Sequence, residues 1–146
     1  METATLLRGH VERTLQEHWE RHTLVVDDDG DYPWRAGRAM CWVRIERDPP
    51  AVSVFAHAAR GLKPSAKLLA EVNELNANAR WVKVYLSGGL VIVGRVLDVD
   101  ACDPAAIRHA CDAVASVAAE IGPPLAAVFG GELPLPPEVE HADDER

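Results

Sequence analysis

Side chains alternate between the two sides of an extended chain along Ala39–Arg47, and this pattern limits the fold more than any other in the sequence. Cys41, Val43 and Ile45 occupy one side, while larger or charged residues occupy the other. Two consecutive prolines follow, and because proline cannot donate to a strand ladder, the chain must turn there. A further apolar run at 51–58 then predicts a second strand, antiparallel to the first.

The remaining elements follow from helical and strand periodicity. The predicted helices span 5–20, 65–78 and 103–121, and the predicted strands span 23–26, 39–47, 51–58, 81–86 and 90–97. An Asp-Gly pair within 27–31 predicts a hairpin turn between the first two strands, and Gly122-Pro123-Pro124 predicts the end of the last helix. The order α-β-β-β-α-β-β-α predicts an α+β fold, with helices packed on one antiparallel sheet.

Length and charge narrow the possible functions. The 146 residues suit one globular domain, and the net charge of −8 argues against a nucleic-acid partner, because phosphate binding needs a basic face. The apolar run 90–99 contains Arg95 and Asp98 and is too short to span a membrane. The N-terminus lacks the basic and apolar regions of a signal peptide. We therefore expect a cytoplasmic protein that has no membrane or nucleic-acid partner.

Motifs for covalent or metal chemistry are incomplete. His18 and His22 have the spacing of paired zinc ligands, but Trp19 stands where a zincin has its glutamate. Alternate aspartates at 27, 29 and 31 begin like a calcium loop, but Arg38 takes the place of the closing glutamate. Of three cysteines, Cys102 alone precedes a helix start, where a thiol pKa can fall. The sequence predicts a protein with no enzymatic activity, no metal and no cofactor.

The second side of the predicted sheet carries a mixture of aromatic residues and long cations. Such side chains offer apolar area together with a polar end, and they are enriched where proteins meet partners. The alternation does not fix which way strand 51–58 faces. The candidate partner-binding residues are Met40, Trp42, Arg44, Phe55, Trp81, Lys83 and Tyr85. The alternatives are that a helix covers this side, that its tryptophan and arginine side chains stack on each other in solvent, or that it is the contact of a structural homodimer.

Segments spread over most of the chain resemble a known family. They are Gly61-Leu62-Lys63-Pro64-Ser65-Ala66-Lys67-Leu68-Leu69, Val72-Asn73-Glu74-Leu75-Asn76, Arg80-Trp81-Val82-Lys83-Val84-Tyr85, Asp103-Pro104-Ala105-Ala106-Ile107, and Ile121-Gly122-Pro123 to Phe129-Gly130-Gly131. Together they resemble the YbjN-like, type III secretion chaperone-like proteins of actinobacteria. The resemblance implies the same element order, frequent homodimers and a peptide-binding chaperone without enzymatic activity. It defines no catalytic or peptide-contact residue.

Residues 1–131 are accordingly predicted to form the chaperone-like domain, and residues 132–146 an acidic, proline-rich, disordered tail. Two other functions stay open alongside the peptide-binding chaperone or adaptor. One is a structural homodimeric subunit. The other is a small-molecule or metal-binding protein that uses His18, His22, His109 or Cys102.

Overall fold

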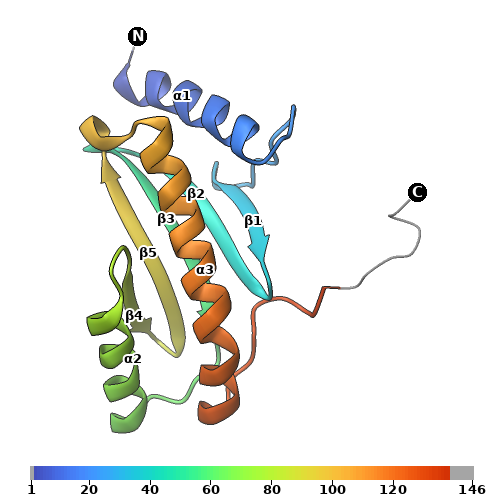
Figure 1. The fold of residues 1–146 in the computed structure, drawn as a ribbon, viewed down its shortest axis with the longest axis vertical. Coiled ribbons are helices and arrows are strands. Elements are labelled where there is room, and N and C mark those ends of the chain that lie inside the picture. The colour runs from blue at the N-terminus through green and yellow to red at the C-terminus, as the bar shows by residue number, and fades with distance from the viewer. Residues whose placement is uncertain (1, 139–146) are drawn as a thin grey trace.

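The computed structural model describes residues 2–138, which form two layers, one of helices and one of strands (Figure 1). The elements in chain order are α1 (Thr3–His18), β1 (Tyr32–Ala36), β2 (Ala39–Arg47), β3 (Pro50–Ala59), α2 (Ala66–Asn78), β4 (Lys83–Ser87), β5 (Leu90–Asp98), a short 3-10 turn (Val99–Ala101) and α3 (Pro104–Phe129). The five strands are antiparallel throughout and lie in the order β1-β2-β3-β5-β4. The predicted α+β fold and its element order are confirmed.

The core lies between the sheet and the helices and is almost entirely aliphatic. Along β2, Ala39, Cys41, Val43 and Ile45 are buried and face the helices, as the alternation predicts. The facing stripe of α3 consists of residues spaced by three or four positions: Ile107, Cys111, Val114, Ala118 and Ile121. Long α3 therefore crosses the middle of the sheet, with α1 on the same side (Figure 1).

The first strand is not where the sequence predicts it, because residues 23–26 form no strand. The Asp27 carboxylate accepts hydrogen bonds from the backbone N–H groups of Asp29 and Asp31, at 3.0 and 2.9 Å. These bonds close a local loop instead of a hairpin. The hairpin turn is instead Gly37 and Arg38, between β1 and β2, and Gly37 has a φ of +59°.

The last helix does not end at Gly122 as predicted, but continues through Pro123 and Pro124 to Phe129. Leu125 and Ala126 prolong its buried stripe, so packing on the core outweighs the loss of two backbone donors. Gly130, in the left-handed conformation with a φ of 71°, ends the helix. By length and composition α3 could cross a membrane, a property that it shares with core helices of soluble proteins.

The two edges of the sheet differ in how much other elements cover them. Helix α2 lies against β4, and its Asn76 side chain accepts the Val84 backbone N–H at 2.7 Å. This contact satisfies a donor that the edge would otherwise leave open. At the other end of the order, β1 pairs with β2 alone among the described strands.

The chain after α3 returns to the sheet. Glu132 and Arg60 exchange two backbone hydrogen bonds of 2.9 Å, and Leu135 donates its N–H to the Arg38 carbonyl at 3.1 Å. Residues 139–146 of the predicted acidic tail lie outside the described residues, and the boundary after residue 131 stays a prediction.

Candidate functional site

One side of the sheet carries none of the described helices, and we call it the open sheet face (Figure 1). Its side chains come from four neighbouring strands and alternate with the core residues. Apart from Gly94, they are half-buried or exposed. They are Met40, Trp42 and Arg44 of β2, Ser53, Phe55 and His57 of β3, Ile92, Gly94 and Val96 of β5, and Lys83 and Tyr85 of β4.

Aromatic rings form the centre of this face. Trp42 lies directly across from Phe55 in the β2–β3 register, and the two rings stack with centroids 5.3 Å apart and planes 20° apart. The His57 ring lies 4.6 Å from the Trp42 ring. Offset rings of this kind stabilise one another, but all three remain partly open to solvent. The centre is therefore a rigid apolar platform without a described cover.

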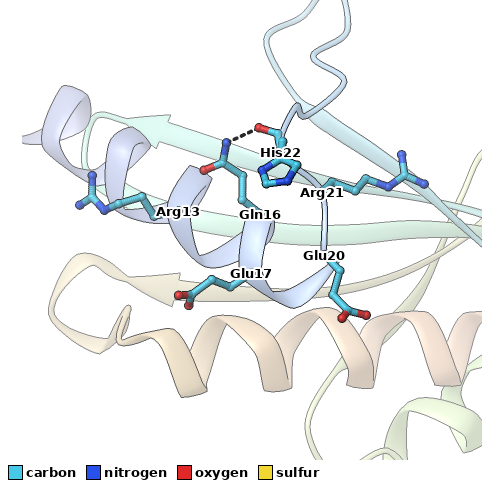
Figure 2. A pocket seen from close by; sticks show the side chains of 6 residues that line it. All are labelled: Arg13, Gln16, Glu17, Glu20, Arg21 and His22. Carbon is cyan, nitrogen blue, oxygen red and sulfur yellow. Dashed lines mark hydrogen bonds between the residues drawn. The ribbon is translucent and has the colours of Figure 1, made fainter.

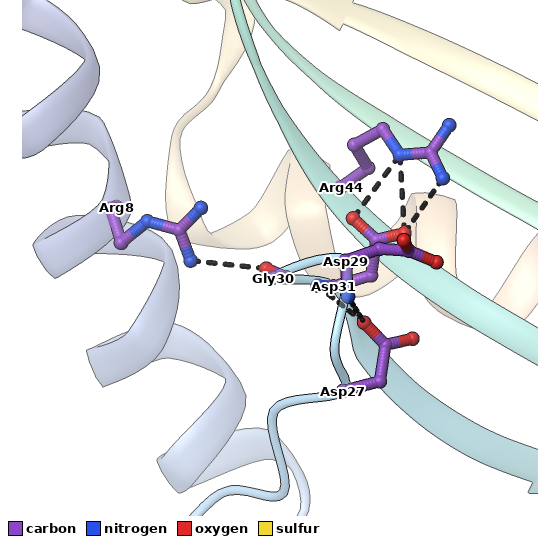
Figure 3. A network of polar contacts seen from close by, with 6 residues as sticks. All are labelled: Arg8, Asp27, Asp29, Gly30, Asp31 and Arg44. Carbon is purple, nitrogen blue, oxygen red and sulfur yellow. Dashed lines mark hydrogen bonds and ion pairs between the residues drawn. The ribbon is translucent and has the colours of Figure 1, made fainter.

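Arg44 flanks this platform, and a buried carboxylate fixes its position (Figure 3). Its guanidinium lies 4.8 Å from the centre of the Phe55 ring. On its other side it donates to both carboxylate oxygens of Asp31, with a shortest N–O distance of 2.7 Å. The hydrogen bond to Asp31 raises the pKa of Arg44. Because Asp31 neutralises this charge, Arg44 extends the platform as a flat plate and is not a free cation.

A second group of side chains lies across Gly94 from the aromatic centre. In the register, Gly94 is opposite Phe55 on one side and Lys83 on the other. Lys83 lies 5.4 Å from the centre of the Tyr85 ring. Tyr85 is 40% exposed and Val96 is 55% exposed. Because Gly94 has no side chain, this part of the face is low, and Lys83, Gly94 and Val96 border a shallow hollow of about 390 Å³.

Trp81 is the one predicted residue that the structure separates from the face. It precedes β4, so strand alternation does not apply to it. Its ring meets His109 of α3 edge-on at 5.0 Å, and its backbone carbonyl accepts a bond from Arg95. Trp81 is 51% exposed and borders the same hollow from the far margin. The structure brings the other six predicted residues together on one face, including Phe55, whose direction the sequence left open.

The candidate metal residues lie apart. Helix α1 ends at His18, whose ring bonds Asp112 of α3 at 2.8 Å. His22 follows a turn in which Glu20 has a φ of 51°. It borders an open, polar hollow of about 540 Å³ beside the end of α1, where its carbonyl accepts the Gln16 amide (Figure 2). This hollow holds charges of both signs and does not bring the two histidines together.

Two further chemical candidates already have partners within the protein. The oxygens of Asp27, Asp29 and Asp31 lie within 4.8 Å of one another, but Asp27 accepts two backbone donors and Asp31 pairs with Arg44. Cys102 is buried, and burial raises its pKa, although it precedes a helix as predicted. Its thiol lies 3.1 Å from the Asp98 carbonyl. A raised pKa is the reverse of thiolate activation.

Sequence reasoning missed five residues of the open sheet face: Ser53, His57, Ile92, Gly94 and Val96. The parity of β3 would have included His57 once Phe55 was oriented, because the two are separated by two positions. Strand β5 reads as an almost continuous apolar run, so its alternation is hidden in the sequence. Only the observed burial separates exposed Val96 from buried Val93 and Leu97.

The comparisons agree with this architecture. The crystal structure of YbjN from E. coli, described there as a candidate transcription regulator, matches with a TM-score of 0.56 and 16% identity over 88% of this chain and 94% of that one. At this identity the likeness shows the fold alone. No curated protein matches the sequence. The family model described as T3SS (YopN, CesT) and YbjN peptide-binding chaperone 1 matches residues 5–137. The chain therefore belongs to this family of peptide-binding chaperones.

His57, on the open sheet face, makes the stability of the protein depend on pH. Burial lowers the pKa of His57, so the folded protein binds this proton less readily than the unfolded chain does. The contribution of His57 to the free energy of unfolding is therefore complete above the ordinary histidine pKa of about 6.5. It falls as the pH drops below this value. We expect the free energy of unfolding to fall on going from pH 7.5 to pH 5.

The measurement is urea unfolding at pH 7.5 and at pH 5. In His57→Gln the difference between the two pH values should be smaller than in the wild type. His22→Gln, at an exposed loop position, serves as the matched control. An unchanged difference in His57→Gln would contradict the role of burial.

Proposed function

We propose that this protein is a non-enzymatic, cytoplasmic peptide-binding chaperone or adaptor whose open sheet face receives an extended polypeptide segment. The observation that carries the proposal is the aromatic platform around Trp42 and Phe55, which lies on a side of the sheet that the described helices leave uncovered. Aromatic side chains with a polar end are enriched in protein interfaces. Membership of a peptide-binding family supports the same function.

The chemistry of the face favours a particular kind of segment. The strands β2, β3 and β5 form hydrogen bonds on both sides, so their backbone is already satisfied, and side chains must supply the recognition. Apolar residues of the segment would cover the platform. Lys83, with Arg80 and Arg95 bordering the adjoining hollow, would favour a carboxylate at one end. The expected ligand is an unfolded segment rich in apolar residues with an acidic flank.

The same face could instead bury itself against a second copy, which is the structural homodimer alternative. Homodimerisation without loss of peptide binding is also compatible with the proposal. A nucleic-acid partner is disfavoured by the net charge of −8, and the description of YbjN as a candidate regulator concerns that protein.

The decisive experiment measures capture of a fluorescently labelled, permanently unfolded reference polypeptide by fluorescence anisotropy. Val96→Glu places a hydrated carboxylate on the open sheet face at an exposed position, so the fold should survive. We expect about tenfold weaker capture, because a bound segment must bury the added charge and its acidic flank is repelled by it. Leu6→Glu is the matched control, since Leu6 is 57% exposed on α1, on the other side of the sheet.

Equal capture by Val96→Glu and wild type would refute binding at this face. Light scattering on the same proteins separates the homodimer alternative. If Val96→Glu converts a dimer to a monomer and leaves capture unchanged, the face is a self-contact and the peptide binds elsewhere.

A further inference from the structure

A second apolar surface lies far from the open sheet face, in a groove between α2 and the last turns of α3. The groove has a volume of about 370 Å³. Leu75 of α2 and Ile121, Leu125 and Phe129 of α3 form its apolar lining. Val128 stands at its border and is 73% exposed, more than any other large apolar side chain among residues 2–138. The groove is thus an apolar channel between two helices on the helical side of the molecule.

The charges around this groove have one sign. Glu71 borders it from α2 and Glu120 borders it from α3, and none of the described lysines or arginines lines it. Among the ion pairs of residues 2–138, none includes either of these carboxylates. Two acidic residues from different helices thus border an apolar groove without a described cation. A ligand that brings its own positive charges on both sides of an apolar strip would satisfy them.

The backbone of α3 lacks two helical hydrogen-bond donors beside the groove. Pro124 lines the groove and has no N–H, so the Glu120 carbonyl one turn earlier lacks the usual helical donor. The Ala119 carbonyl likewise lacks its usual helical donor, because residue 123 is also a proline. A carbonyl without its helical donor favours a ligand that donates hydrogen bonds. Lysine and arginine donate and do not accept.

We propose that this groove docks a basic amphipathic helix of a partner protein, as a surface separate from the open sheet face. The apolar strip of such a helix would fill the channel between α2 and α3, and its lysines or arginines would pair with Glu71 and Glu120. This is the established way in which a groove between helices receives a third helix.

Charge disfavours the other occupants of the groove. A two-fold contact between copies would bring the same acidic borders together in a chain of net charge −8. The chain's own residues 139–146 carry Glu140, Asp143, Asp144 and Glu145, so they have the wrong sign. An anionic membrane surface is repelled for the same reason.

The test uses two synthetic peptides of eighteen residues each, about five helical turns, with leucines at helical spacing. One peptide has lysine at its polar positions and the other has glutamate. We expect the full-length protein to bind the lysine peptide at least about tenfold more tightly than the glutamate peptide. Glu71 and Glu120 attract the lysine peptide and repel the glutamate peptide. The Glu71→Gln/Glu120→Gln double variant should bind the lysine peptide about fivefold more weakly.

Three single variants locate the binding. Val128→Lys, at the exposed border of the groove, should weaken binding of the lysine peptide at least about tenfold. The variant loses an apolar contact and places a like charge beside the peptide. Val96→Lys on the open sheet face and Leu6→Lys on α1 should leave binding of the lysine peptide unchanged. Circular dichroism confirms that each variant is folded.

The proposal is overturned if the two peptides bind equally, or if Val128→Lys binds the lysine peptide like the wild type. It is also overturned if Val96→Lys removes binding of this peptide, because the open sheet face would then be the site. Conversion of a dimer to a monomer by Val128→Lys would identify a second copy as the occupant and overturn it as well. Capture of the unfolded polypeptide at the open sheet face is scored separately, so the two proposals fail independently.

Discussion

Replacing Gly122 with alanine should lower the free energy of unfolding by about 3 kcal/mol, at the upper end of what overpacking costs. Helix α3 passes so close to β3 at this point that an added Cβ would fall on the carbonyl oxygen of Ala58. The Ala58 carbonyl carbon would lie at 3.2 Å and Leu133 at 3.4 Å. The obstacle is backbone in the middle of a sheet, so it cannot rotate away, and the helix must shift. The measurement is urea unfolding of the variant and the wild type.

Gly9→Ala is the matched control, because Gly9 also lies inside a helix. An added Cβ there meets only the flexible end of Arg13, at 3.5 Å. Alanine forms helix more readily than glycine, so this variant should be more stable by up to about 1 kcal/mol. If both variants are stabilised, close approach of α3 to β3 does not limit residue 122.

The second large effect is a loss of stability in alkali. Burial raises the pKa of the Cys41 and Cys111 thiols to about 12. In the unfolded chain a thiol ionises near its ordinary value of about 8.5. Between these values the unfolded chain releases protons that the folded protein keeps. The contribution of these thiols to the free energy of unfolding is therefore complete below about pH 8.5, and above it each thiol lowers this energy by about 1.4 kcal/mol per pH unit.

Tyr32 strengthens this dependence at higher pH. Burial, followed by its hydrogen bond to Glu12, raises the pKa of Tyr32 to about 12, so its contribution begins above the ordinary value of about 10. Thermal unfolding from pH 8 to pH 10.5, with a reductant present, should give a steep fall in the wild type. The Cys41→Ala/Cys111→Ala variant should give a much shallower one.

Val114→Ala is the control for the cavities that the cysteine substitutions leave. Val114 is fully buried on the same stripe of α3, but it does not titrate. Its variant should be less stable at every pH and keep the slope of the wild type. A double cysteine variant with the slope of the wild type would mean that these thiols do not govern the alkaline transition.

Local periodicity was sufficient to predict most of the fold. Strand β2 has the predicted bounds, and the buried stripe of α3 has the predicted members, since each pattern repeats over a short stretch and has one buried side. Strand β1 could not be found this way. Its position depends on Asp27, which closes a loop through its own side chain, and on contacts of Tyr32 with Arg8 and Glu12 of distant α1.

The candidate surface was predictable only in part, because its residues belong to strands whose order is not their order in the chain. Met40, Trp42 and Arg44 follow from alternation within β2. These residues share a face with Tyr85 in one sheet because β5 lies between β3 and β4. The sequence pattern does not specify this strand order. Strand alternation places Trp81 on this surface only if β4 begins before Lys83, and the strand begins at Lys83.

The return of the chain after α3 bears on the order in which the protein can be completed. Arg60 and Arg38 receive backbone partners from Glu132 and Leu135, residues far along the chain from both. The β1–β2–β3 meander needs only contacts between near neighbours, but these last bonds close loops that contain most of the molecule. During synthesis from the N-terminus, the meander can therefore form early. Only the backbone bonds from Glu132 to Arg60 and from Leu135 to Arg38 must wait until residues 132–135 have left the ribosome.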